Sequence, residues 1–233
     1  MGSFHEVFRN RHVVLPVIHV ESQSQALRNA EIAHDEGADG VFLISMRGMP
    51  HRELLEMQRI ARGEFSTWFI GVNYLDLPAV SVFKNLDKGV SGVWADDAQI
   101  DEFAERQVNA AVIRTAREQS GWPGLYFGGV AFKYQREVDD FSLAARIASQ
   151  FMDVVTTSGD KTGHPPSPEK IMMMKRAIGE KPLAIASGIS SDNVGDYKDN
   201  ADSFLVATSI LVEGTEDFDK FRVRDLIRAV RGT

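Results

Sequence analysis

Two short stretches near the C-terminus combine serine, threonine and glycine in a pattern that suits anion binding. Ser187, Gly188 and Ser190 follow one apolar run, and Thr208 and Ser209 follow the next. Hydroxyls and unpaired backbone amides at the ends of neighbouring parallel strands can bind phosphate. We therefore expect these five residues to form a phosphate site. In the purely structural alternative, Gly188 only makes a tight turn and Ser190 only caps the next helix.

A lysine and a polar loop follow two other apolar runs. We expect Lys133 to bind an anion as an ammonium, although burial would make it a base or nucleophile and full solvation would leave it without a role. The loop SGDKTGHPPSPEK holds Asp160, a candidate general base, and three candidate substrate contacts, Lys161, Thr162 and Gly163. Its adjacent prolines restrict the backbone, so a rigid connection is the alternative.

Three further residues lie where apolar runs end in the first half of the chain. His19 can move a proton near neutral pH, or can be a structural histidine. Asn73 can orient a ligand or stabilise an oxyanion, or can bond a turn. Asp96, next to Asp97, can act as a base or bind Mg²⁺ through oxygen, or can cap a helix. We expect all three to be catalytic, with Mg²⁺ as the only cofactor to consider.

The histidines show no spacing that is typical of a zinc site, and the chain has no cysteine. We therefore predict no dedicated metal site. The lack of cysteine also excludes disulfides and a cysteine nucleophile, and fits a reducing compartment.

The order of apolar runs and helical patterns predicts the fold. Strand-like runs alternate with helix-like segments, and several runs are apolar without strict alternation, as in parallel strands covered by helices. The expected helices include one over 100–121 and one that opens at 190–193. The expected strands are 12–20, 38–45, 65–74, 90–98, 125–135, 153–159, 182–188 and 203–210.

Eight such units predict an α/β protein, a single TIM (β/α)8 barrel domain over residues 1–233, since such barrels have roughly 250 residues. A doubly wound open sheet is the competing fold. The first strand does not lead into Gly-x-Gly-x-x-Gly, the usual dinucleotide signature of that fold, so we favour the closed barrel.

Charge and hydropathy restrict the partners. The net charge is −7 and the isoelectric point is about 5.4, which disfavours binding to duplex nucleic acid. No signal-peptide core and no run of about 18 apolar residues occurs, so we expect a cytoplasmic protein without a membrane partner. Barrels often associate, so a homo-oligomer is an open expectation.

Several motifs together resemble the BtpA/SgcQ family of (β/α)8 proteins. They are VIHV, EGADGV, GVNYL, VAFKYQ, TTSGDKTGHPPS, ASGISSDNV and ADSFLVATSI. The resemblance implies a phosphate-binding barrel and places seven residues at matching positions: His19, Asn73, Lys133, Asp160, Thr162, Gly188 and Ser209. The segments ISMRGMP and VWADDA depart from the family pattern and indicate a divergent member.

These observations predict an enzyme that acts on a small phosphorylated metabolite, of a phosphoribosyl or nucleotide-like kind. Transferase, lyase and isomerase chemistry all stay open. The family is associated with photosystem I biogenesis, so the alternative is a non-catalytic assembly or regulatory factor.

Overall fold

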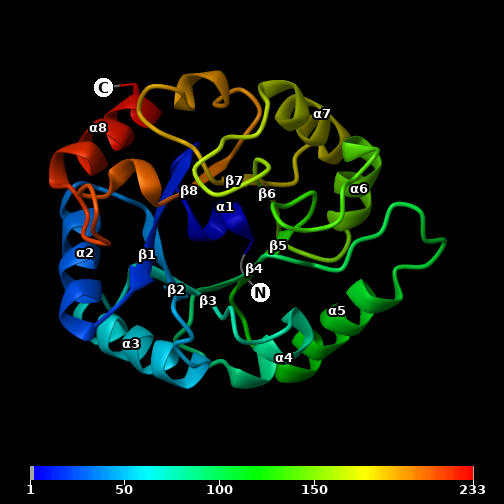
Figure 1. Ribbon diagram of the computed structural model, residues 1–233. Helices are drawn as coiled ribbons and strands as arrows, with labels where there is room; N and C mark the ends of the chain where they lie inside the picture. Colours follow the sequence, from blue (N-terminus) through cyan, green and yellow to red (C-terminus); the bar gives the residue numbers. More distant parts are fainter. Residues whose placement is uncertain (1–2, 233) are drawn as a thin grey trace.

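The chain folds into a closed barrel of eight parallel strands, each followed by a helix or a helical turn (Figure 1). The computed structural model describes residues 3–232; Met1, Gly2 and Thr233 of the predicted domain lie outside the described residues. The strands are β1 (Val13–Val20), β2 (Gly40–Ser45), β3 (Phe69–Asn73), β4 (Gly92–Ala95), β5 (Leu125–Gly129), β6 (Val154–Thr157), β7 (Leu183–Ala186) and β8 (Ser203–Val206).

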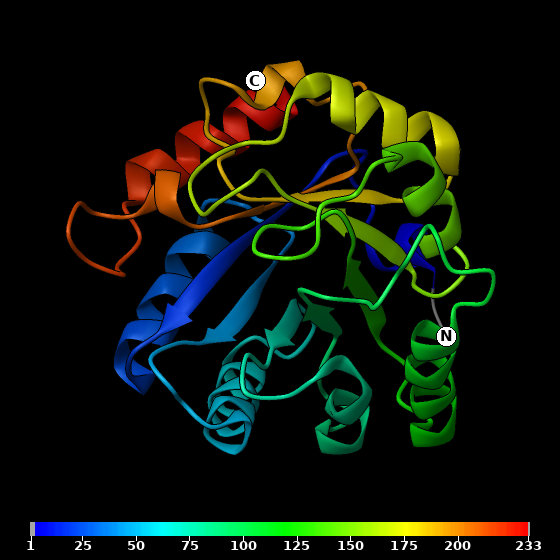
Figure 2. The same cartoon turned by 45° about the vertical axis from the view of Figure 1, so that its right-hand side comes forward.

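The helices form the outer layer around the strands (Figures 1 and 2). They are α1 (Phe4–Val7), α2 (Gln23–Asp35), α3 (His51–Glu64), α4 (Ala79–Val82), α5 (Val108–Ser120), α6 (Phe141–Ala148), α7 (Pro168–Ile178) and α8 (Lys220–Arg231). Three 3₁₀ turns complete the described elements: η1 (Phe83–Asn85), η2 (Val194–Asp196) and η3 (Thr208–Ile210). Helix α1 is the exception among the described helices, because it lies within the ring of strands in the view of Figure 1.

The first and last strands close the ring. Val13 pairs with Ser203 of β8, and Val17 pairs with Phe42 of β2. All eight neighbouring pairs are parallel, so every strand ends on the same side of the barrel. The predicted TIM (β/α)8 fold is confirmed.

Strand residues divide between two apolar clusters. In β1, Leu15 and Val17 belong to a cluster inside the barrel, whereas Val14 and Ile18 belong to the larger cluster between strands and helices. Successive side chains of a strand point to opposite faces, and both faces are buried here. This two-sided burial explains the nearly continuous apolar runs in the sequence.

Helix α1 closes the end of the barrel where the strands begin. Phe4 and Phe8 are buried in the inner cluster, and the ring of Phe8 lies 4.9 Å from that of Phe69. The opposite end, where the strands finish, stays available for a site. The sequence patterns did not predict this short helix.

Two expected helices are wrong in part. Between β7 and β8 the chain forms only η2, because Ser, Asp, Asn and Gly dominate this segment and favour turns. Before β5, the helix begins at Val108 rather than near residue 100. Side-chain bonds between Gln107 and the backbone of Asp101 hold that preceding stretch in a non-helical form.

Across residues 3–232, none of the helices has both the length and the apolar character needed to cross a bilayer.

Candidate functional site

A cavity of about 280 Å³ opens at the end of the barrel where the strands finish; we call it the mouth cavity. Its walls come from the ends of β1, β2, β4, β7 and β8 and from the loops after β5 and β6. Nine of the predicted site residues line it: His19, Asp96, Lys133, Thr162, Gly163, Ser187, Gly188, Thr208 and Ser209. The barrel thus brings together residues that are far apart in the sequence.

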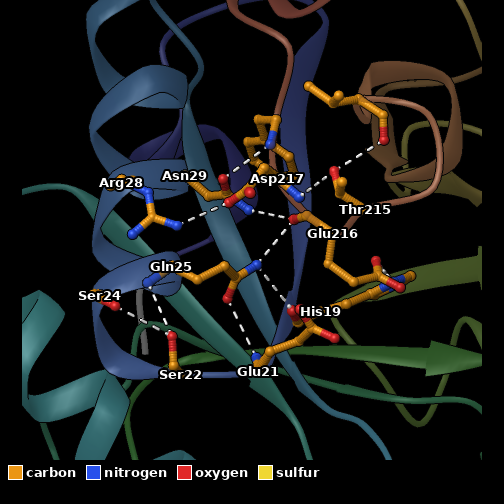
Figure 3. A network of polar contacts seen from close by, with 12 residues as sticks. His19, Glu21, Ser22, Ser24, Gln25, Arg28, Asn29, Thr215, Glu216 and Asp217 are labelled. Atoms are coloured by element: carbon orange, nitrogen blue, oxygen red, sulfur yellow. Dashed lines mark hydrogen bonds and ion pairs between the residues drawn. The ribbon is translucent and has the colours of Figure 1, made fainter.

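His19, the penultimate residue of β1, is paired with a carboxylate. Its Nδ1 lies 2.7 Å from Oε2 of Glu216, in the loop between η3 and α8 (Figure 3). A carboxylate at Nδ1 orients the imidazole and leaves Nε2 as the nitrogen that can exchange a proton. The pair is therefore suited to general acid–base catalysis.

Two amide side chains of α2 hold Glu216 in place. Asn29 donates to the Glu216 carbonyl at 2.7 Å, and Gln25 donates to the same oxygen at 2.9 Å (Figure 3). Asn29 also accepts from the amide of Phe218 at 2.9 Å. The orange-red loop projects from the barrel at the left of Figure 2, yet these bonds fix its Glu216 end beside β1.

Asp96 directly follows β4 and is hydrogen-bonded to Asn73, another of the predicted site residues. Nδ2 of Asn73 donates to Oδ1 of Asp96 at 3.0 Å. Burial raises the pKa of the Asp96 carboxyl, against the opposing effects of the Asn73 bond and the Lys133 charge. Asn73 is buried and does not line the mouth cavity, so its contact with the site runs through Asp96.

Lys133 lies in the loop after β5, four residues past the strand end, and the residue that follows β6 holds its backbone. Its amide donates to Oγ of Ser158 at 2.7 Å, and its Nζ donates to Oγ of Ser187 at 3.3 Å. The ammonium therefore lies beside the loop after β7, where an anion was expected.

A second lysine fastens the loop that carries Lys133. Nζ of Lys170, in α7, donates to the carbonyls of Ala131 at 2.6 Å and Ser158 at 2.7 Å. Burial lowers the pKa of Lys170 to about 8. These bonds tie the loops after β5 and β6 together.

Three non-glycine residues in the loops around this cavity have a positive φ. Ala131, Tyr134 and Ser187 have φ values of +48°, +62° and +117°, a region that residues with a side chain rarely adopt. Such conformations are costly and often occur at functional sites. Here they shape the loop of Lys133 and the turn after β7.

The loops after β7 and β8 partly fit the expected phosphate site. Among residues 3–232, the amides of Gly188, Thr208 and Ser209 have no hydrogen-bond acceptor, so they are free to bind an oxyanion. Oγ of Ser209 donates to the Ile189 carbonyl at 2.6 Å and joins the two loops. Ser190 does not line the cavity, and its amide donates to Oδ1 of Asn193.

Gly188 has a second role in packing. A Cβ on this residue would lie 2.1 Å from the backbone nitrogen of Pro165, and its φ is +67°. The loop after β6 therefore packs directly against the turn after β7. The closest approach to Gly188 is therefore that of a neighbouring loop of the same chain.

The loop after β6 contributes only part of its predicted residues to the mouth. Thr162 and Gly163 line the mouth cavity, and Oγ1 of Thr162 accepts from the Tyr134 hydroxyl at 3.3 Å. Asp160 instead lines a neighbouring cavity with Lys170, and Lys161 is exposed. A catalytic role for Asp160 and a binding role for Lys161 stay predictions.

The described residues contain few side chains that are placed to bind a metal ion. Within 3–232 no group of three or more His, Cys, Asp or Glu side chains is placed to bind one. Asp97 bonds the backbone and side chain of Gln99 in its own loop, so Asp96 is the one carboxylate of this pair at the mouth. Mg²⁺ would have a single carboxylate ligand here.

Sequence reasoning missed Glu216, Ser158 and Lys170. Glu216 lies six residues past the end of the last predicted strand, 203–210, and only its polar neighbours in VEGTED indicated a loop. Lys170 lies within a helix, where a lysine is usually solvated. No local pattern distinguishes either residue from a surface charge.

The C-terminal part of the chain has a recognisable relative. The model of the BtpA family matches residues 130–232, from the loop of Lys133 to the end of α8. The resemblance to the BtpA family is confirmed. The match includes the loops after β6, β7 and β8; the resemblance of VIHV, EGADGV and GVNYL to the BtpA family lies outside it and stays a prediction. Among curated proteins, none matches the sequence.

Several solved structures share the fold. A phosphoribosyl anthranilate isomerase from Thermus thermophilus has a TM-score of 0.64 at 13% identity, over 94% of this chain and 98% of its own. A geranylgeranylglyceryl phosphate synthase from Thermoplasma acidophilum, in complex with sn-glycerol-1-phosphate, has a TM-score of 0.67 at 14% identity over 100% of both chains. A native KDPGal structure has a TM-score of 0.69 at 11% identity, with 97% of each chain covered.

Proposed function

We propose that this protein is an enzyme that acts on a small phosphorylated metabolite. One observation carries the proposal: a single cavity is lined by His19, which is paired with Glu216, by Lys133 and by the residues after β7 and β8 whose amides lack an acceptor. A proton-transfer group beside an anion site is what chemistry on a phosphate ester needs.

Each part of the site has a distinct task in this proposal. The amides of Gly188, Thr208 and Ser209 bind the phosphate oxygens, with support from the hydroxyls of Ser187 and Thr208. Lys133 stabilises negative charge that develops on the substrate. His19 moves a proton through Nε2, and Asp96 provides a second acid–base group. Transferase, lyase and isomerase reactions all use these roles.

Two of the similar folds are consistent with the substrate class. One is named for a phosphoribosyl compound, and the other holds sn-glycerol-1-phosphate. These likenesses support the choice of a phosphoribosyl or nucleotide-like monophosphate as the first substrate to test. The expected partner is this small ligand; association into a homo-oligomer stays a prediction.

Ligand-induced stabilisation tests the proposal. We expect one or more members of a panel of inorganic phosphate, ribose 5-phosphate, glycerol phosphates and nucleoside monophosphates to raise Tm. A ligand at a hundred times its Kd adds about 2.7 kcal/mol, or roughly 5–11 °C for a chain of this size.

A matched pair of variants locates the binding. Thr208→Asp adds a negative charge at the exposed edge of the site and should abolish the shift, whereas Thr115→Asp, on the exposed surface of α5, should keep it. A panel without any shift, or an unchanged shift in Thr208→Asp, contradicts the proposal. The first result would favour the non-catalytic assembly or regulatory role.

A further inference from the structure

A second, larger cavity lies next to the mouth cavity, between the ends of β3 and β4 and helices α4 and α5; we call it the side cavity. Its volume is about 600 Å³, about twice that of the mouth cavity. The two cavities share Asp96 and Leu75 in their walls. The two cavities are therefore adjacent, and a molecule that occupied both would pass Asp96.

The walls of the side cavity are mainly apolar. Tyr74, Leu77, Val80, Val112 and Ile113 form most of them, with Pro78 and Ala79 at the start of α4. Small-molecule sites combine such walls with a few polar groups that fix orientation. The polar side chains in its walls are two carboxylates and three amides: Asn73, Asp96, Asp97, Gln99 and Asn109.

The charges of the two cavities differ. Lys133 and His19 line the mouth cavity, whereas the walls of the side cavity contain two aspartates and no Lys, Arg or His. A second phosphate or a carboxylate would lie there without a cation to offset its loss of hydration, and close to negative charge. The side cavity therefore disfavours an anionic group.

The volumes of the two cavities also indicate that they bind different parts of a substrate. Sites for small molecules usually have roughly 300–1,000 Å³, and the mouth cavity falls just below this range at about 280 Å³. It suits a phosphate and the few atoms next to it. The side cavity supplies the space for the rest of a larger substrate.

We infer that the substrate is a phosphate monoester whose second half is uncharged or cationic, largely apolar, and carries a hydrogen-bond donor that meets Asp96. The inference rests on the proposed phosphate site. It selects aryl or alkyl monophosphates with a hydroxyl or amine, and it excludes bisphosphates and carboxylated esters as good ligands.

A series of phosphate ligands tests the inference. Inorganic phosphate, methyl phosphate, phenyl phosphate, naphthyl phosphate and 2-carboxyphenyl phosphate are titrated by calorimetry against the whole chain. We expect naphthyl phosphate to bind at least about tenfold more tightly than methyl phosphate, because its rings bury apolar surface. The carboxylate of 2-carboxyphenyl phosphate should remove the gain that phenyl phosphate shows.

Two tryptophan variants on one helix assign the gain to the side cavity. Val112 lines the side cavity and Val108, one turn earlier on α5, does not; their exposed fractions are 50% and 64%, so either position tolerates a larger side chain. Val112→Trp should abolish the preference for naphthyl phosphate and keep the affinity for inorganic phosphate. Val108→Trp should change neither.

The outcomes separate the two proposals. If inorganic phosphate binds but naphthyl phosphate gains nothing, or Val112→Trp keeps the gain, the inference about the side cavity is wrong and the phosphate site stands. If the carboxylated ester binds as tightly as phenyl phosphate, the charge argument is wrong. If Thr208→Asp leaves inorganic phosphate binding unchanged, the proposed function itself is wrong.

Discussion

Single side chains at the barrel mouth depend on partners from distant parts of the chain. His19 is paired with Glu216, 197 positions later, and Lys133 reaches Ser187, 54 positions later. Each pair joins a group that can titrate to a group that fixes its position. The chemistry of these residues therefore depends on contacts that exist only in the closed barrel.

Asp96 should destabilise the fold at neutral pH. Burial raises its pKa above the ordinary 3.8, so the folded state binds the proton more tightly than the unfolded state. The free energy of unfolding therefore falls as pH rises through the pKa values of the unfolded and folded states. We expect Asp96→Asn to raise that free energy at pH 7, because the amide has no charge to bury. The gain should vanish near pH 3, where Asp96 is protonated in both states.

Urea unfolding at the two pH values measures this effect. Asp97→Asn is the matched control, since Asp97 is exposed and bonded within its own loop. Equal effects of the two substitutions at pH 7 would rule out a special environment at Asp96.

Lys170 gives a prediction at alkaline pH. Its pKa is about 8 in the folded state against an ordinary 10.5, so the folded state loses the proton first. Between these values the unfolded state binds more protons, and the free energy of unfolding rises with pH. We expect the stability of the natural protein relative to Lys170→Met to increase by about 1–3 kcal/mol from pH 7.5 to 10.

The same comparison with Lys220→Met, on the half-exposed start of α8, should show no such trend. A difference between the natural protein and Lys170→Met that stays constant with pH would contradict the shifted pKa.

At the level of elements, loops rather than helices determine the shape of the site. The loop after β6 packs on the turn after β7 at Gly188, and Lys170 joins the loops after β5 and β6. The absence of an α-helix between β7 and β8 in the described chain leaves Asn193 to bond the Gly188 carbonyl and the Ser190 amide. The helix that the sequence predicted between β7 and β8, next to the site, was thus wrong in part.

Substitution of one glycine tests this loop packing. Gly188→Ala would bring a Cβ into the backbone of Pro165 and force alanine to a φ of +67°, so we expect a loss of about 2 kcal/mol or more in the free energy of unfolding. Gly195→Ala is the control, because a Cβ there meets no atom within 4 Å. Similar losses in both variants would disprove the close contact.

At the level of the whole molecule, the two ends of the barrel have separate tasks. Phe4 and Phe8 fill the end where the strands begin, and the mouth cavity lies at the other end. The inner cluster connects them: Leu205 belongs to it and also lines the mouth cavity. Stability and ligand binding should therefore respond to different substitutions.

Phe8→Ala should separate the two properties. Phe8 is 5% exposed, and loss of a buried phenyl ring typically costs about 3–5 kcal/mol. We expect a large drop in the free energy of unfolding and an unchanged Kd for the best phosphate ligand, measured below the lowered Tm. Phe103→Ala, at a residue that is 68% exposed, should change neither. A weaker Kd in Phe8→Ala alone would show that Phe8 also influences the shape of the mouth cavity.

The sequence alone was sufficient for the eight strands and for most of the helices between them, since burial on two faces leaves long apolar runs that are visible without coordinates. It also placed His19, Asp96, Lys133, Gly188 and Ser209 at the same end of the barrel, because strand ends in a barrel share one face. Only the tertiary structure identified Glu216 as the partner of His19 and Lys170 as the fastener of the Lys133 loop, and moved Asp160 away from the mouth. The reason is physical. Local apolar patterns indicate which strands are buried, whereas the positions of polar side chains in long loops depend on contacts between segments that lie far apart in the sequence.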